Sequence, residues 1–297
     1  MIGELAALGA AISWAIAPIL YRKALLNTKP ISANIVRCAT NAAVLVPILL
    51  LSGQLAALTS LPMQTIMLVV ISGIVGLGIG DTLYMIGLKY VGVSRAVPLG
   101  STYPLFSLIW ATLILNQHLT VPEIIGAAVI VGGIWLLTRQ KNDDPHETKN
   151  KLALIGITVS LAAALVWSIS IALMDAAAAH ITSLSTNYAI ITVRITSLAL
   201  FLLILAPLLD KEHGFAKMNR NTIIGLCIGG LIANGLGWLL MNISFQNITV
   251  ANATPISSTS PLFAAIAGFL LFREKMTPKA ILGAIAIVTG ICLIFIL

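Results

Sequence analysis

The stretch AVPLGSTYPLF, residues 96–106, returns as ATPISSTSPLF, residues 253–263. Each copy places two prolines six residues apart, with an adjacent serine and threonine between them, inside a long apolar run. Prolines are costly in lipid, because the backbone carbonyls that they leave unpaired find no water there. Hydroxyl groups are costly for a similar reason, since they too need a hydrogen-bond partner. A costly pattern that occurs twice predicts an internal repeat.

The composition places this repeat in a membrane. Of the 297 residues 59% are hydrophobic and 9% are charged, and the mean hydropathy is +1.02, which exceeds what a globular core can hide. The apolar runs last about twenty residues, which favours helices over the roughly ten-residue strands of a barrel. We therefore expect an all-α integral membrane protein with ten transmembrane helices, near residues 3–21, 32–52, 65–88, 92–115, 121–138, 152–174, 185–209, 221–242, 250–272 and 279–297.

The second half of the chain aligns with the first when it is moved back by 157 positions. This shift superimposes Gly78 on Gly235, Gly80 on Gly237, Pro98 on Pro255, Pro104 on Pro261 and Arg37 on Arg194. Trp14 and Trp167 match if four residues of the following loop are allowed for. We predict a first five-helix repeat at residues 1–138, a polar linker at 139–151 and a second five-helix repeat at 152–297.

The basic residues predict how the two repeats are oriented. An odd number of helices per repeat makes the second copy enter the membrane from the opposite side. Of the 17 lysines and arginines, all but Arg37 and Arg194 lie in the loops after spans one, three, five, seven and nine, or within the first four residues of the next span. By the positive-inside rule, this bias predicts inverted repeats in the cell membrane, with the odd-numbered loops in the cytoplasm and both termini outside.

Three charged residues, Arg37, Asp81 and Arg194, lie more than four residues inside the predicted spans. An ionised carboxylate deep in a helix costs roughly 2.5 to 3.5 kcal/mol, so Asp81 should face a cavity or an arginine. Substrate binding, proton coupling or pairing with a structural partner would each satisfy that need. Arg37 and Arg194 are expected to stabilise the bundle or its gates, with Arg37 near enough to a helix end to reach the interface.

We expect a solute cavity at the axis between the two repeats. The paired prolines would let spans four and nine bend, and hydroxyl and aromatic side chains would line the cavity. The alternatives are that the hydroxyls bond their own backbone and that the rings pack the bundle. The predicted substrate-binding residues are Trp14, Asp81, Tyr84, Ser101, Thr102, Tyr103, Trp167, Asn234, Trp238, Ser258 and Thr259. The predicted kink or gating residues are Pro98, Pro104, Pro255 and Pro261.

Other chemistry has little support in the sequence. The three cysteines and four histidines lack the spacing of metal ligands, so we expect no metal site and no cofactor. An enzyme would need a nucleophile, an acid–base pair or metal ligands at depth, and apart from Asp81 the spans offer none, so we expect no enzyme.

The order of motifs resembles a known family. A tryptophan, then an arginine, then P(L/I)xSTxPLF occur in both halves, and FREKMTPKAILGAIAIVTG follows at residues 272–290. This pattern is similar to that of the drug/metabolite transporter superfamily, in its EamA-type branch of ten-helix carriers. Glu274 matches the Glu of a Gly-Glu pair that closes span nine, whereas Asn116 and Gln117 replace the pair of span four.

The resemblance implies secondary transport, often export, of amino acids, other metabolites or drugs through a central cavity. Relatives are described with both termini in the cytoplasm, opposite to the orientation that the charges predict. We expect a secondary active transporter that exports a small metabolite by alternating access, with proton coupling through Asp81 as the central hypothesis. A flippase of lipid-linked substrates is the alternative. The expected partners are a small-molecule substrate and the lipid bilayer, with no nucleic acid, and the protein is a monomer or a homodimer.

Overall fold

A computed structural model describes residues 1–59, 61–106, 109–110, 120–138, 147–178, 183–212, 214–248, 256–257, 259–272 and 277–296. Within these ranges the regular structure is helical. The helices of the first half are α1 (Ile2–Leu25), α2 (Pro30–Leu51), α3 (Ala56–Thr59), α4 (Met63–Ser72), η1 (Gly73–Gly80), α5 (Asp81–Val91), α6 (Val93–Gly100) and α8 (Val121–Thr138). Those of the second half are α9 (Glu147–Ala178), α10 (Leu184–Leu209), η2 (Gly214–Lys217), α11 (Arg220–Gly230), η3 (Leu231–Gly237), α12 (Trp238–Asn247), α14 (Ser260–Phe272) and α15 (Pro278–Ile296).

Six helical stretches are long and apolar enough to cross a membrane: Ile2–Leu25, Pro30–Leu51, Met63–Val91, Lys151–Met174, Leu184–Leu209 and Arg220–Ser244. They coincide, to within a few residues, with six of the predicted spans. The helices α8 and α15 cover two more with shorter apolar stretches, and the spans predicted at 92–115 and 250–272 are described only in part. The all-helical class is confirmed, and the count of ten stays a prediction.

The bundle exposes aliphatic side chains and buries polar ones. On α10, Ile204 is 75% exposed and Leu200 is 57% exposed, whereas Asn187 and Arg194 on the same helix are buried. Water would disfavour such a surface, but lipid favours it.

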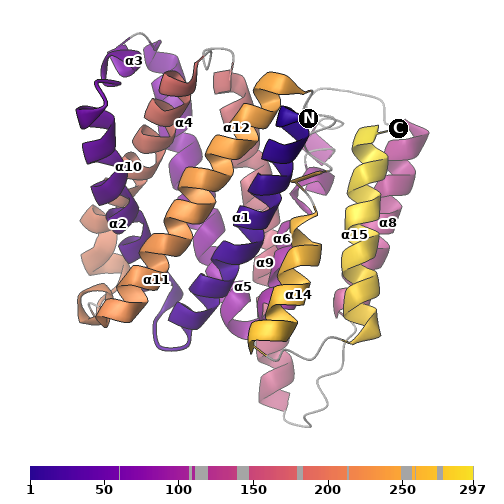
Figure 1. The fold of residues 1–297 in the computed structure, drawn as a ribbon. Coiled ribbons are helices and arrows are strands. Elements are labelled where there is room, and N and C mark those ends of the chain that lie inside the picture. The colour runs from indigo at the N-terminus through magenta and orange to yellow at the C-terminus, as the bar shows by residue number, and fades with distance from the viewer. Residues whose placement is uncertain are drawn as a thin grey trace.

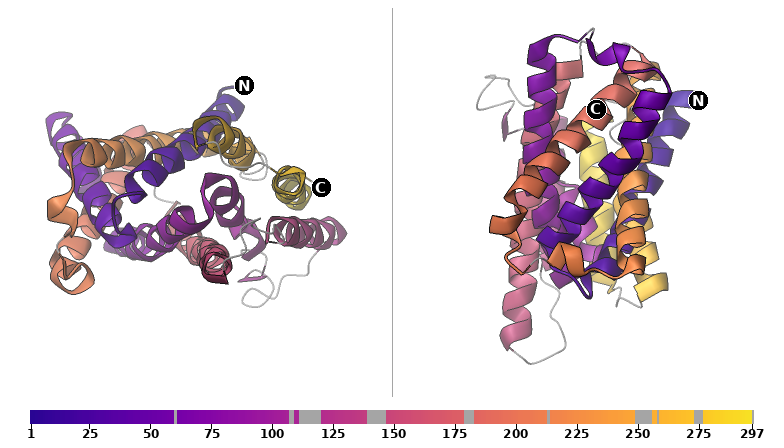
Figure 2. Two further views of the ribbon diagram at one scale, coloured as in Figure 1. Left: turned by 90° about the horizontal axis from the view of Figure 1, so that it is seen from below. Right: turned by 90° about the vertical axis from the view of Figure 1, so that its left-hand side faces the viewer.

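The two ends of the chain lie at the same end of the bundle (Figure 1). The segments 26–29 and 214–219, which carry basic residues, lie at the opposite end. The helices α8 and α15 form a pair at one edge, away from α2 and α10 (Figure 2). Glycine lets this pair touch, because a Cβ atom added at Gly126 would lie 2.6 Å from the Gly290 carbonyl oxygen.

Two helices change pitch near their centres. The π-helical segments η1 and η3 separate α4 from α5 and α11 from α12. Moved by 157 positions, η1 falls on residues 230–237, so the two π-helical segments occupy equivalent positions of the two halves. A wider turn leaves a carbonyl free for a donor from another helix, and such turns are frequent at functional sites.

The quoted stretch breaks its helix. The helix α6 ends at Gly100, Ser101 and Thr102 form a turn, and helix resumes at Tyr103. The physical reason is Pro104, which has no N–H to donate to the Gly100 carbonyl.

Equivalent hydrogen bonds close the break in both copies. The backbone N–H of Thr102 donates to Leu99 at 3.3 Å, and that of Thr259 donates to Ile256 at 3.2 Å. Pro98 lies inside α6 and Pro261 in the first turn of α14, whereas Pro255 lies outside the described residues.

Candidate functional site

A cavity of about 160 Å³ lies between helices of the two halves. Its wall draws on α1, α2, η1, α5 and α6 of the first half and on α9, α10, η3, α12 and α14 of the second. The lining residues are Trp14, Ala17, Pro18, Tyr21, Arg37, Leu77, Asp81, Tyr84, Val97, Gly100, Ser101, Tyr103, Trp167, Ser170, Ile171, Arg194, Ala233, Asn234, Trp238, Ser257 and Ser260. A wall made by both halves is what a site at a repeat axis requires.

The cavity brings most of the predicted substrate-binding residues together. Those in its wall are Trp14, Asp81, Tyr84, Ser101, Tyr103, Trp167, Asn234 and Trp238. The two arginines within spans, Arg37 and Arg194, line it as well.

Two predicted residues are not in the wall. Thr102 is fully buried, and its hydroxyl donates to the Leu99 carbonyl at 2.7 Å. Thr259 donates likewise to the Ile256 carbonyl at 2.7 Å. Both hydroxyls therefore satisfy carbonyls at the helix breaks, as in the alternative that hydroxyls bond their own backbone, and a role toward substrate stays a prediction. Ser258 lies outside the described residues.

Several lining residues lie outside the set predicted from the sequence. Ser257 and Ser260 lie one helical turn apart beside the second helix break, at the positions equivalent to Gly100 and Tyr103. The repeat would have identified Ser260, whose equivalent Tyr103 was predicted, and helical spacing would have identified others, since residues three or seven apart share a face. Tyr21, seven residues after Trp14, and Ser170, three after Trp167, follow the same rule.

The two matched tryptophans make equivalent bonds across the halves. Trp14 Nε1 donates to the Ala233 carbonyl in η3 at 3.2 Å, and Trp167 Nε1 donates to the Gly76 carbonyl in η1 at 3.2 Å. Gly76 and Ala233 are themselves equivalent under the shift of 157 positions. Each π-helical segment thus accepts a hydrogen bond from the first helix of the other half.

Glycines make room for these indole rings. A Cβ atom at Gly80 would lie 2.6 Å from Trp167 Cδ1, and one at Gly237 would lie 2.6 Å from Trp14 Nε1. No L side chain fits there unless an indole moves, so the matched glycines are needed for close approach.

Asp81 forms a buried ion pair with Arg37. Its Oδ2 lies 2.6 Å from Arg37 Nη1, and its Oδ1 accepts a hydrogen bond of 2.8 Å from Trp167 Nε1. Arg37 Nη2 also donates to Asn34 Oδ1 at 2.7 Å. Of the two environments expected for Asp81, a cavity and an arginine, the structure provides both.

Arg194 has different surroundings from its equivalent, Arg37. Its Nη2 donates to Ser170 Oγ at 2.8 Å, and its guanidinium lies over the Trp238 ring at 5.1 Å from the centroid. Trp238 occupies the position equivalent to Asp81. Among the described residues, no carboxylate lies within ion-pair distance of Arg194.

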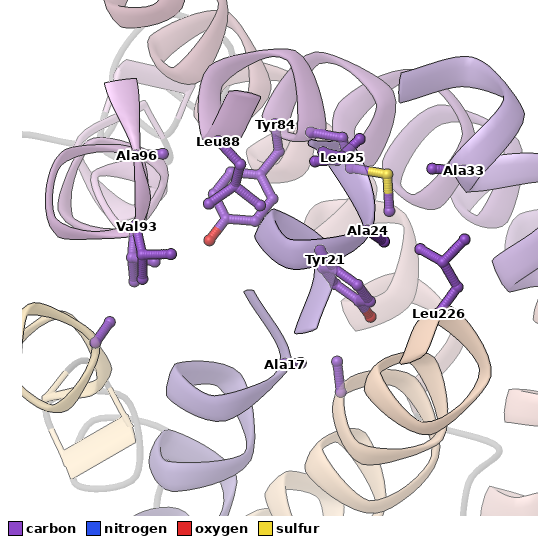
Figure 3. Close-up of a cluster of buried hydrophobic side chains, with 14 of the residues drawn as sticks. Ala17, Tyr21, Ala24, Leu25, Ala33, Tyr84, Leu88, Val93, Ala96 and Leu226 are labelled. Atoms are coloured by element: carbon purple, nitrogen blue, oxygen red, sulfur yellow. The ribbon is translucent and has the colours of Figure 1, made fainter. Parts of the chain in front are cut away.

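A hydrophobic cluster lies at one end of the cavity. Tyr21 and Tyr84 line the cavity. Leu25 and Leu88 lie one turn further along α1 and α5, and both are fully buried in the same cluster as Val93. Figure 3 shows these side chains gathered between α1, α5, α6 and α11. The cluster thus lies between the cavity and the bundle end that carries residues 26–29.

At the other end of the cavity, the residues equivalent to Tyr21 and Tyr84 are Met174 and Met241, and their side chains do not pack together. Met174 of α9 packs with Val69 and Ile190, whereas Met241 of α12 packs with Ala10 in a separate cluster. In the part of the chain that the structure describes, the two ends of the cavity are therefore packed differently.

Outside the spans, Asp210 holds α2 to the segment before α11. Its carboxylate accepts from the Ser32 hydroxyl at 2.8 Å and from the Phe215 N–H at 2.9 Å. Burial raises the pKa of the Asp210 carboxyl, but the hydrogen bonds from Phe215, Ser32 and Gly214 outweigh it and leave the pKa below its ordinary value.

Comparison with known proteins places the chain in a family. The model of the EamA-like transporter family matches residues 1–139 and 154–296. An uncharacterized transporter of Archaeoglobus fulgidus is 26% identical over 296 residues, covering 100% of this chain and 99% of that protein. The uncharacterized transporter YvbV of Bacillus subtilis is 20% identical over 255 residues, covering 82% of this chain and 79% of that protein.

The fold is similar to that of a solved structure over nearly the whole chain. One solved crystal structure of a protein superposes with a TM-score of 0.65, over 98% of this chain and 95% of that chain, and at 15% identity this likeness concerns the fold alone. The apolar helices and the transporter family together make this a multi-pass membrane protein. Because the family model spans both halves, the chain belongs to the EamA-like transporter family.

Proposed function

We propose that this chain is a secondary active transporter that exports a small organic solute by alternating access. The observation that carries the proposal is a cavity whose wall comes from equivalent helices of both halves, with a buried hydrophobic cluster around Leu25 and Leu88 at one end, which we take to seal that end. A carrier needs a central site that one gate closes at a time.

We propose further that the halves are inverted repeats. The matched hydrogen bonds from Trp14 to Ala233 and from Trp167 to Gly76 support this arrangement. If the basic loops are cytoplasmic in the cell membrane, the sealed end faces the cytoplasm and the cavity opens outward. Transport then requires α1 and α5 to part while α9 and α12 close around Met174 and Met241.

We propose that Asp81 couples this exchange to protons. Protonating the carboxylate would weaken its ion pair with Arg37 and free a guanidinium in the cavity wall. The variant Asp81→Asn, assayed in proteoliposomes, should lose the dependence of solute flux on a pH gradient. If the variant transports solute and retains that dependence, Asp81 is not the coupling group.

Counterflow in proteoliposomes tests the proposed transport. Purified protein is reconstituted with a panel of labelled amino acids and organic acids, and exchange of internal for external solute is measured. The variant Ser101→Trp, which would fill the cavity, should abolish exchange. Gly132→Trp adds the same bulk where an added Cβ has no neighbour within 4 Å, and it should exchange normally.

Lipid translocation is measured in parallel, because a flippase of lipid-linked substrates would use the same repeats. Fluorescent lipids that cross the bilayer in the absence of any solute exchange would contradict the proposed carrier and favour the flippase.

A further inference from the structure

The cavity wall carries an uncompensated positive charge. The charges of Arg37 and Asp81 cancel at 2.6 Å, whereas Arg194 has only a serine hydroxyl and the face of an indole as partners among the described residues. Arg194 is 5% exposed, and its Nε has no hydrogen-bond acceptor in the described structure. A buried guanidinium without a carboxylate partner from the protein is costly, so a bound anion would stabilise this site.

The two halves differ in the side chain that lies beside their equivalent arginines. Arg37 and Arg194 are equivalent, and the position that holds Asp81 in the first half holds Trp238 in the second. The first half thus supplies its own carboxylate to its arginine. The second half places an aromatic ring there and leaves the guanidinium facing the cavity.

We propose that Arg194 binds the anionic group of the transported solute, which takes the place that Asp81 takes beside Arg37. The inference rests on the proposed transport function and names its substrate class. A carboxylate, sulfonate or phosphate would accept charge-assisted hydrogen bonds from the guanidinium. Trp14 and Trp238, with rings 5.6 Å apart in an edge-on arrangement, would contact an apolar or aromatic body.

The same wall disfavours an ammonium group on the solute. Asp81 has both oxygens engaged, Oδ2 by Arg37 and Oδ1 by Trp167. The described residues of the wall provide no other carboxylate. Residues 107–119 and 249–255, which complete the sequences of spans four and nine, contain no Asp or Glu. The proposed substrates are therefore organic anions without an ammonium group, in preference to zwitterionic amino acids and cationic drugs.

Binding to the purified full chain tests the assignment with five probes that share one phenyl ring. The probes are benzoate, phenyl phosphate, phenylalanine, benzylamine and benzyl alcohol, and binding is followed by the quenching of tryptophan fluorescence. Benzoate or phenyl phosphate should bind at least about tenfold more tightly than the other three, because a buried charge pair favours one sign of ligand charge. The stronger of these two anions distinguishes a carboxylate site from a phosphate site.

Charge variants show whether Arg194 is the group responsible. Arg194→Gln should lose the preference for anions, and Arg194→Lys should keep it in part because the charge remains. Trp238→Asp supplies the equivalent of Asp81, so it should bind benzoate on the order of tenfold more weakly than the uncharged variant Trp238→Asn. Thermal unfolding confirms that each variant is folded. A preference for benzylamine or phenylalanine, or an unchanged preference in folded Arg194→Gln, would overturn the proposal.

Counterflow of labelled benzenesulfonate, which stays ionised and does not leak through lipid, separates this inference from the proposed function. Exchange of benzenesulfonate supports both. Exchange of cationic or neutral solutes alone would refute the anion site and leave the transporter intact. Tight anion binding with no exchange of any solute would refute the transporter and leave the anion site intact.

Discussion

The carboxylate of Asp81 lies 2.6 Å from the guanidinium of Arg37, with side chains 9% and 2% exposed. Removing one partner of such a buried pair leaves the other uncompensated, at a cost of about 3–5 kcal/mol. We expect Arg37→Gln and Asp81→Asn each to lower the free energy of unfolding in detergent by about that amount. The double variant should lose less than the sum, because no charge is left alone. Thermal or chemical unfolding measures all three, and additive losses would contradict the pairing.

The two cavity tryptophans should differ in their contribution to stability. Both donate to a carbonyl of a π-helical segment, but only Trp167 also donates to Asp81, at 2.8 Å. We expect Trp167→Phe to destabilise more than Trp14→Phe by about 1–2 kcal/mol, as for a hydrogen bond to a charged group. Unfolding in one detergent compares them. A larger loss for Trp14→Phe would argue against the bond to Asp81.

Glycines in the π-helical segments give a third prediction. Alanine at Gly80 or Gly237 would bring a methyl group to 2.6 Å from an indole ring atom, so each substitution should cost about 1–3 kcal/mol by overpacking. The matched control is Gly235→Ala, in the same segment as Gly237, where an added Cβ has no neighbour within 4 Å. Unfolding temperatures that fall equally for all three variants would show that backbone flexibility, not close approach, explains these glycines.

Asp210 makes the free energy of unfolding depend on pH under acidic conditions. Its pKa is lower in the folded protein than the ordinary value of 3.8, so the folded state binds fewer protons and stability rises with pH across that range. The stabilisation is present above the ordinary pKa and is lost as the pH falls through the lowered value. The unfolding temperature of the unsubstituted protein should exceed that of Asp210→Asn near neutral pH, and the difference should shrink below about pH 4. A difference that does not change with pH would contradict the shift.

The sequence contains enough to predict where the apolar helices lie. Long apolar runs can satisfy their backbone groups only as helices, which is why α1, α2, α9 and α10 lie within a few residues of the predicted spans. The sequence also indicates most of the residues in the cavity wall, because Trp14, Asp81 and Trp167 are unusual in the middle of a membrane span.

The orientation of small hydroxyls was not predictable in the same way. Thr102 and Ser101 are neighbours in one motif, yet Thr102 bonds the Leu99 carbonyl and Ser101 lines the cavity. Which one turns inward depends on the turn that Pro104 imposes. The pairing of Asp81 with Arg37 in preference to Arg194 depends likewise on helix packing that a single sequence does not specify.

Sided labelling of a cavity cysteine tests alternating access most directly and needs no knowledge of the substrate. Ser101→Cys is placed in a variant in which Cys38, Cys227 and Cys292 have been replaced, and a membrane-impermeant thiol reagent is applied to either side of the membrane. Thr102→Cys, one residue away and fully buried, is the matched control. If access alternates, Ser101→Cys is labelled in time from either side and Thr102→Cys is labelled from neither. Labelling of Ser101→Cys from one side alone, however long the exposure, would contradict it.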